Sequence, residues 1–73
     1  MNYTILIHPA EEGGFWSEVP ALPGCYSQGE SIDETLKNSK EAIEAHLQAM
    51  KEDLGAAPAE ESLFIGQVQV EVI

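Results

Sequence analysis

Polar and apolar residues alternate near the end of the chain, where residues 67–73 read QVQVEVI, with Val68, Val70 and Val72 on one side and Gln67, Gln69 and Glu71 on the other. A period of two is typical of a β-strand with one packed face and one solvated face. Residues 2–8 (NYTILIH) are rich in β-branched and aromatic side chains, and residues 15–19 (FWSEV) alternate between two faces. A glycine-containing turn at 10–14 would join them as a hairpin with a longer loop. With residues 25–28 (CYSQ) as a short third strand, the pattern predicts four strands.

A helical spacing dominates the middle of the chain. Residues suited to a packed face recur every three or four positions: Ile32, Leu36, Ser39, Ile43, Leu47, Met50 and Leu54. Ser31 can accept a hydrogen bond from the backbone N–H near Glu34, and the Glu34 side chain can reach back, which makes a capping box. Gly55 suits the position just past a helix, and Pro58 prevents its continuation. We therefore predict one long helix that ends before Gly55.

The order of these elements, β-β-β-α-β, predicts the α+β class. Three strands would form an antiparallel meander, and the helix would cross over, in the usual right-handed sense, to a fourth strand. The small, acidic segment 55–62 is expected to be a loop. The result is a four-stranded sheet with one helix on one face. The other face must then be polar or be covered by a partner.

Composition narrows the function classes. A chain of 73 residues fits a single domain spanning 1–73, and so small a core would gain from self-association or a partner surface. Thirteen acidic residues against three lysines and no arginine give a net charge of −10. This balance disfavours direct nucleic-acid binding and anionic membrane surfaces. It suits a basic protein partner, although solubility alone would explain it equally well.

Localisation and redox chemistry follow from what the sequence lacks. The single cysteine cannot form an internal disulfide. No apolar run approaches the roughly 18 residues that span a bilayer, and the N-terminus lacks the basic region of a signal peptide. We expect a cytoplasmic protein.

Catalytic chemistry finds little support in the residues. Cys25 would need a base and a lowered pKa, and nothing in the sequence places His8 or His46 beside it. One cysteine and two distant histidines also lack metal-ligand spacing. The acids within residues 30–34 are explained by helix capping and by the helix dipole. We therefore expect no enzyme, metal or cofactor, with thiol chemistry at Cys25 or a nuclease remnant as the less favoured alternative.

Two aromatic residues are candidates for an interface. An alternating strand places Trp16 and Tyr26 on definite sheet faces. Large aromatic residues fill cores and interfaces about equally often, so both readings stay open. Our hypothesis is that Trp16 and Tyr26 contribute to an interface on the uncovered face.

Residues 13–47 resemble the HicB family of antitoxins. The resemblance rests on Phe15, Val19-Pro20, Leu22-Pro23-Gly24-Cys25, Ser27-Gln28-Gly29-Glu30-Ser31, Glu34, Leu36, Asn38 and Glu41-Ala42-Ile43. The first strand and the final valine-rich strand fit the family layout, whereas Thr35 departs from the alanine common there. The resemblance implies the same β-β-β-α-β order, described for the family as a partial RNase H-like fold.

The resemblance also gives the stretch VPALPGCYSQGES (19–31) a structural role. Pro20 and Pro23 fix φ, and Gly24 permits a tight turn into the third strand. Gly29 then turns the chain into the helix capped by Ser31 and Glu34. On this interpretation Cys25 contributes to packing. The set expected to form the structural motif is Pro20, Pro23, Gly24, Cys25, Gly29, Ser31 and Glu34.

HicB proteins typically bind a small, basic toxin of the HicA type, which cleaves mRNA, and block its active surface. The resemblance therefore implies an antitoxin-like binding module within a toxin–antitoxin system. With Glu18 and Glu71 as the carboxylates on predicted strands, nuclease activity is not expected. The chain stops directly after the predicted fourth strand, so no C-terminal DNA-binding domain is expected. The alternative is a stand-alone structural or regulatory domain that self-associates as a homodimer or larger homo-oligomer.

Overall fold

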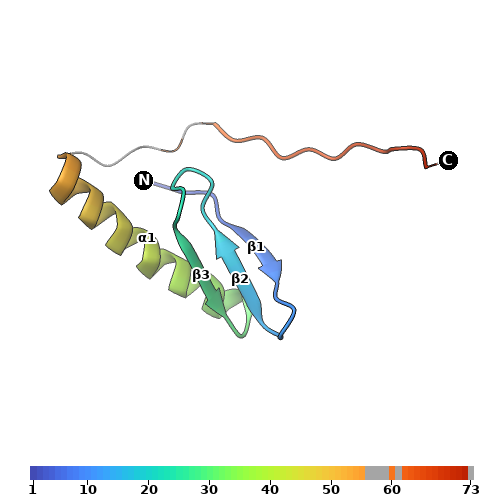
Figure 1. Cartoon of the computed structure of the whole chain (residues 1–73), viewed down its shortest axis with the longest axis horizontal. Coiled ribbons are helices and arrows are strands. Elements are labelled where there is room, and N and C mark those ends of the chain that lie inside the picture. The colour runs from blue at the N-terminus through green and yellow to red at the C-terminus, as the bar shows by residue number, and fades with distance from the viewer. Residues whose placement is uncertain (56–59, 61, 73) are drawn as a thin grey trace.

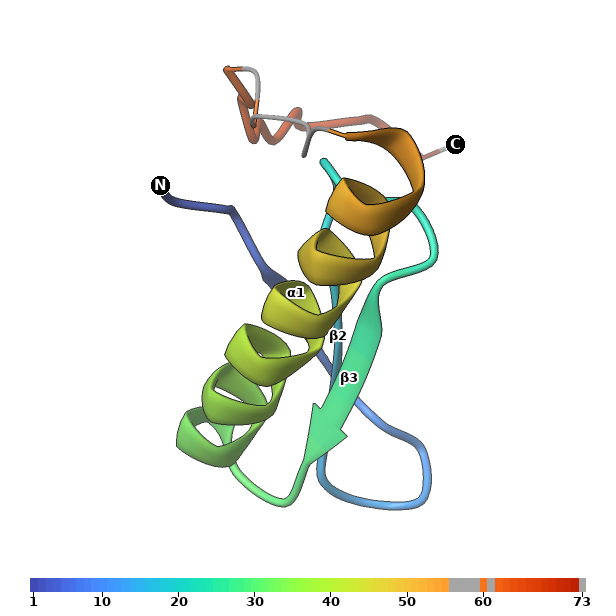
Figure 2. The ribbon, with the colours of Figure 1, turned by 90° about the vertical axis from the view of Figure 1, so that its left-hand side faces the viewer.

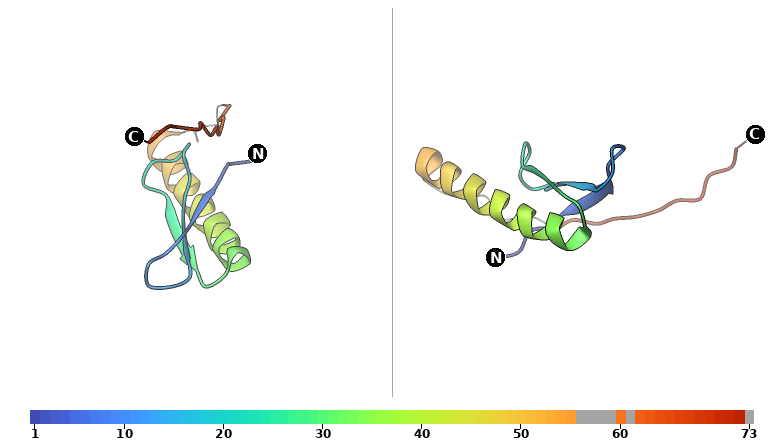
Figure 3. Two further views of the ribbon diagram at one scale, coloured as in Figure 1. Left: turned by 90° about the vertical axis from the view of Figure 1, so that its right-hand side faces the viewer. Right: turned by 90° about the horizontal axis from the view of Figure 1, so that it is seen from below.

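The computed structural model has three strands and one helix (Figure 1). It describes residues 1–55, 60 and 62–72. The elements are β1 (Leu6–Pro9), β2 (Phe15–Glu18), β3 (Tyr26–Gly29) and α1 (Ile32–Leu54). The strands form one antiparallel sheet in the order β1-β2-β3, and α1 lies across one face of it (Figures 2 and 3). The predicted α+β class and the three-stranded meander are confirmed.

The strands are shorter than the alternation predicts. Leu6 pairs with Glu18, and the same register continued toward the N-terminus would place Thr4 opposite Pro20. A proline has no N–H for a ladder, and the chain turns there, so pairing ends and β1 begins at Leu6 rather than at residue 2. The third strand begins at Tyr26, one residue later than predicted, because the Cys25 N–H bonds within the preceding turn.

The predicted fourth strand is not part of this sheet. Residues 62–72, here called the C-terminal arm, are described as an exposed segment with no strand pairing, and it leads away from the body in Figure 1. Ile73 and most of the predicted loop 55–62 lie outside the described residues. The four-stranded sheet and the partial RNase H-like fold therefore stay predictions.

The helix begins and ends at the residues that the spacing predicts. Ser31 has extended backbone angles (φ −134°, ψ 167°), and its Oγ accepts a hydrogen bond from the Glu34 N–H at 3.1 Å. The Glu34 carboxylate reaches one residue further back than a standard capping box, to the Glu30 N–H at 3.2 Å. At the other end Gly55 adopts φ 77°, and its N–H donates to the Lys51 carbonyl.

The connection between β2 and β3 consists of two successive turns. The Leu22 N–H donates to the Val19 carbonyl at 2.9 Å, and the Cys25 N–H donates to the Leu22 carbonyl at 3.0 Å. A proline occupies the second position of each turn, and Gly24 has a φ of 87° at the third position of the second turn. Proline followed by a residue with positive φ is the signature of a type II turn.

These two turns direct every third residue inward. Val19, Leu22 and Cys25 are all buried, and together with Ile43 of α1 they form the core. Five partly buried residues pack around this cluster: Tyr3, Ile5, Ala42, Leu47 and Met50. The proline- and glycine-rich stretch is therefore a folded lobe that closes one end of the sheet against the helix.

A polar contact joins β2 to α1 inside this packed layer. Ser17 and Ser39 are fully buried, and their Oγ atoms lie 2.7 Å apart. The Ser39 hydroxyl donates to the Thr35 carbonyl at 2.6 Å, which leaves Ser39 to accept from Ser17. Both hydroxyls are thus satisfied away from water, as buried polar groups require.

Replacing Ser39 is expected to cost more stability than replacing Ser17. Ser39→Ala leaves the buried Ser17 hydroxyl without its acceptor, at a cost of about 1–3 kcal/mol, whereas Ser17→Ala leaves the Ser39–Thr35 bond intact and costs about 1 kcal/mol. Because the double variant orphans no hydroxyl, it should lose less than the two single losses added together. Urea unfolding of the three variants measures this, and strictly additive losses would contradict the coupling.

Candidate functional site

The sheet face opposite α1 carries side chains from all three strands. The registers place His8 opposite Trp16 and Tyr26 opposite Glu18. The intervening Ser17 points to the other side, where α1 buries it. We call this surface the open face and define it by Leu6, His8, Trp16, Glu18, Tyr26 and Gln28.

The open face is held in a definite arrangement by contacts among its own side chains. The His8 and Trp16 rings stack at a centroid distance of 4.3 Å, and the Tyr26 ring lies 6.3 Å from Trp16 at an angle of 52°. His8 Nε2 lies 2.9 Å from Glu18 Oε2, which ties the imidazole to a carboxylate on the next strand. Contacts of this kind reduce the side-chain entropy that a binding event must remove.

Both aromatic residues singled out from the sequence are accessible on this face. Trp16 is 37% exposed and Tyr26 is 64% exposed. Tryptophan and tyrosine are enriched among the residues that dominate binding energy at protein interfaces. Their rings also attract the flat guanidinium of arginine, and the Glu18 carboxylate beside them can form an ion pair with it. The open face is chemically suited to a basic protein surface.

A second polar surface lies at the end of the molecule where α1 begins. The β1–β2 turn and the start of α1 line a hollow of about 340 Å³ that contains three glutamates: Glu12, Glu30 and Glu34. Asn38 spans it by donating to the Gln28 carbonyl at 2.8 Å. Helix capping explained two of these acids from the sequence. The position of Glu12 beside them is set by the hairpin and carried no sequence signal.

Cys25 lies in the core and not on the open face. Its side chain is 4% exposed, and burial raises the pKa of the thiol because the thiolate would lose its hydration. The thiol is therefore held in its less nucleophilic form. His8 belongs to the open face, and His46 lies half-buried on α1. The structure does not bring the cysteine and His8 together, because they belong to opposite sides of the sheet.

Metal binding and membrane insertion can also be examined in the described part of the chain. Within residues 1–55, 60 and 62–72, no three histidine, cysteine or acidic side chains are grouped so that they could hold a metal ion. In the same residues, no helix combines the length and the apolar character that crossing a membrane requires.

Comparison with known proteins identifies the family. Residues 3–71 match the model of the HicB-like antitoxins of bacterial toxin–antitoxin systems. A UPF0150 protein of Archaeoglobus fulgidus is 40% identical over 72 residues, which cover 99% of this chain and 96% of the relative. UPF0150 protein Ta0767 of Thermoplasma acidophilum is 47% identical over 51 residues, or 70% of this chain and 74% of the relative. UPF0150 protein ssl0259 of Synechocystis is 60% identical over 37 residues, 51% of each chain.

The chain belongs to the HicB-like antitoxin family, whose members include proteins named UPF0150. The resemblance noted in residues 13–47 is thereby confirmed and extends over nearly the whole chain. Membership supports an antitoxin-like role and suggests a toxin as partner. It also favours a regulatory function over a catalytic one.

Proposed function

We propose that this protein is an antitoxin that neutralises a small, basic, mRNA-cleaving toxin of the HicA type. It acts by covering the active surface of the toxin and carries out no catalysis itself. The observation that carries the proposal is the open face: prearranged, exposed aromatic residues beside a carboxylate, in a member of an antitoxin family. Trp16 and Tyr26 are its central contact residues, and Glu18 is its charged one.

The charge of the chain supports a basic partner. The net charge of −10 attracts a positive protein over the whole surface, which accelerates encounter and weakens as salt screens it. At short range, the arrangement of side chains on the open face determines which contacts form. Basic side chains of the toxin stack on the Trp16 and Tyr26 rings and pair with Glu18, and positive groups then cease to be available for RNA phosphates.

The proposal predicts that a short basic protein is encoded beside this gene, and the direct test is calorimetry with that protein at two salt concentrations. We expect submicromolar binding that weakens as salt increases, together with loss of RNA cleavage when the two proteins are mixed. The proposal would be refuted if the neighbouring basic protein bound no more tightly than unrelated basic proteins do. Tight binding that leaves RNA cleavage unchanged would also refute it.

Trp16→Ala is expected to weaken toxin binding about 30-fold or more, since a central interface tryptophan typically contributes at least about 2 kcal/mol. The change removes a ring that contacts both His8 and Tyr26, so the whole aromatic row loses its order. Leu36→Ala is the matched control, because Leu36 is a similarly exposed apolar residue (42%) on α1, away from the open face. Equal affinities for the two variants would remove the open face from the interface.

A stand-alone, self-associating regulatory domain is the second candidate function. The C-terminal arm favours it, because its apolar side chains are exposed in the single chain. A stable homo-oligomer that neither binds nor inhibits the neighbouring basic protein would support this function over the antitoxin.

A further inference from the structure

The C-terminal arm presents more apolar surface than an isolated chain readily tolerates. Six of its side chains are exposed large hydrophobic residues: Leu63, Phe64, Ile65, Val68, Val70 and Val72. The radius of gyration is 14.8 Å, whereas a compact chain of this length would have about 11 Å. Contiguous exposed apolar residues of this kind mark an interaction site. We therefore expect the apolar side chains of the arm to bind another surface.

One contact fixes where the arm starts. The Glu60 carboxylate accepts a hydrogen bond from the Thr4 backbone N–H and another from the Thr4 hydroxyl, the latter at 3.1 Å. Thr4 lies two residues before β1, where pairing with β2 has ended. Glu60 thus holds the chain beside the start of the first strand, and we call this contact the Glu60 clasp.

The Glu60 clasp places the valine repeat beyond the reach of the chain's own β1. Thr4 and Pro9, the last residue of β1, are five positions apart, and five positions after Glu60 is Ile65. If the arm ran alongside β1 in the same direction, with the usual strand rise per residue, Ile65 would lie opposite Pro9. Residues 67–72 would then lie past the end of β1. In Figure 1 the arm continues beyond the end of the body. Pairing this repeat with its own β1 would require the clasp to break.

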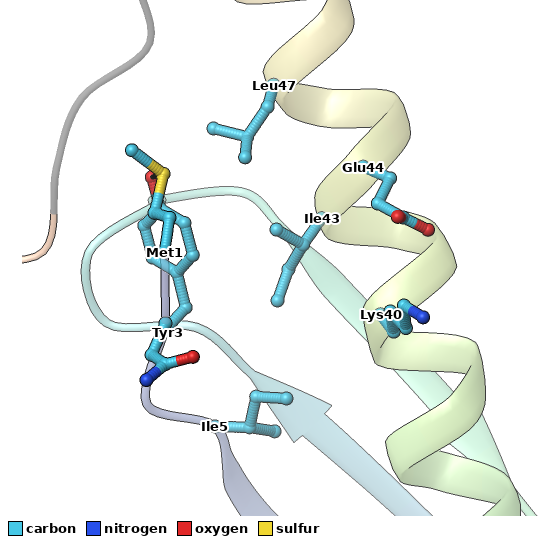
Figure 4. A pocket seen from close by; sticks show the side chains of 8 residues that line it. Met1, Tyr3, Ile5, Lys40, Ile43, Glu44 and Leu47 are labelled. Atoms are coloured by element: carbon cyan, nitrogen blue, oxygen red, sulfur yellow. Dashed lines mark hydrogen bonds between the residues drawn. The ribbon is translucent and has the colours of Figure 1, made fainter.

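A receiving surface exists along the same edge of the sheet. β1 is an edge strand, and in the described part of the chain no strand pairs with its outer side. Next to it lies a groove of about 460 Å³ between the N-terminal segment and α1. Tyr3 and Ile5 form one wall, and Ile43 and Leu47 form the other (Figure 4). Lys40 and Glu44 of α1 stand at its rim.

We propose that residues 67–72 dock on a second copy of this chain. The segment adds as a strand to the outer edge of the second copy's β1, and Val68, Val70 and Val72 enter its groove. The exchange is reciprocal, as in an isologous two-fold dimer. For an arm that runs in the direction of its own β1, a two-fold axis perpendicular to both makes the added strand antiparallel to the β1 that receives it.

Three observations support the docking of this segment on β1 and its groove. Its period of two sends the valines into the apolar groove while Gln67, Gln69 and Glu71 remain on the solvated side. Lys40 and Glu44 at the rim carry opposite charges, so these two side chains present no net charge to the uncharged valine side of the arm. Strand addition also closes the exposed β1 edge, which would otherwise invite uncontrolled pairing.

Sedimentation of the full chain, without any toxin, tests the exchange. Wild type and Gln69→Lys should sediment as dimers, and Val70→Lys should sediment as a monomer, because only the valine enters the groove. The two substitutions add the same side chain at neighbouring positions on opposite sides of the arm. A monomeric wild type, or a Val70→Lys dimer as tight as wild type, would overturn the proposal.

Isotope-filtered NMR on wild type identifies the chain that receives the arm. In a mixture of labelled and unlabelled protein, we expect contacts from valine methyls of one chain to Ile5 and Ile43 of the other. Contacts within one chain alone would mean that the arm is that chain's own fourth strand, which overturns the exchange. Because no toxin is present, either result is independent of the proposed antitoxin function.

Discussion

Leu22→Ala is expected to lower the free energy of unfolding by about 2–5 kcal/mol, the range for a leucine truncated in a closed core. Leu22 is 1% exposed and is the largest fully buried side chain among the described residues. It also joins the two turns that lead from β2 to β3, through its N–H to Val19 and its carbonyl to Cys25. Those backbone bonds hold the loop in place, so the structure cannot collapse far enough to fill the cavity.

The loss matters because the chain is small. For 73 residues a total stability of about 4–11 kcal/mol is typical, so this one change removes a large part of it. Urea unfolding followed by the far-ultraviolet helix signal measures the loss. Leu36→Ala, the same substitution at a half-exposed position of α1, should cost at most about 1 kcal/mol. Similar losses at the two positions would show that Leu22 is not part of a closed core.

Gly29→Ala is expected to destabilise the fold by about 3 kcal/mol, the upper part of the range for an overpacked core. A Cβ built on Gly29 would lie 2.7 Å from the Thr35 backbone N, 2.7 Å from Thr35 Oγ1 and 3.0 Å from the Glu34 carbonyl carbon. Two of these three atoms belong to the backbone, so no rotation of a side chain relieves the overlap. The first turn of α1 must move away from β3.

Gly66→Ala is the control for this change. A Cβ at Gly66 meets nothing within 4 Å, and the residue lies in the exposed arm. Its thermal midpoint should equal that of wild type, whereas the midpoint of Gly29→Ala should fall by many degrees, since about 1 kcal/mol shifts a domain of this size by roughly 4–8 °C. Adding Thr35→Ala to Gly29→Ala removes one of the three overlaps and should restore little. An unchanged midpoint for Gly29→Ala would contradict the close seating of α1 on β3.

Local rules in the sequence were sufficient for the helix and for the turns of the motif. The capping residue Ser31 and the terminating Gly55 act within one helical turn of their own positions, so their effect can be read without knowledge of the fold. The same holds for Pro23 and Gly24, whose backbone preferences specify a turn wherever it is placed. The sequence also placed Trp16 and Tyr26 on definite strand faces through a period of two.

Features that depend on contacts between distant residues could not be predicted from the sequence. Ser39 occupies the apolar stripe of the helix, and its pairing with the buried Ser17 depends on how β2 is seated against α1. The row of His8, Trp16 and Tyr26 requires the register of three strands. The alternation in residues 67–73 predicts a strand, but it carries no information on which edge, or which chain, that strand joins.

The sequence by itself determined the α+β class, the helix bounds, the three-stranded meander, the acidic character of the surface and the antitoxin family. Each of these follows from local backbone preferences, side-chain periodicity, composition or a contiguous motif. Only the tertiary structure decided that Ser17 pairs with Ser39, that the aromatic residues share an exposed face, and that Glu60 clasps Thr4. Those outcomes depend on how separate segments pack, because burial and contact are set by neighbours that lie far away along the chain.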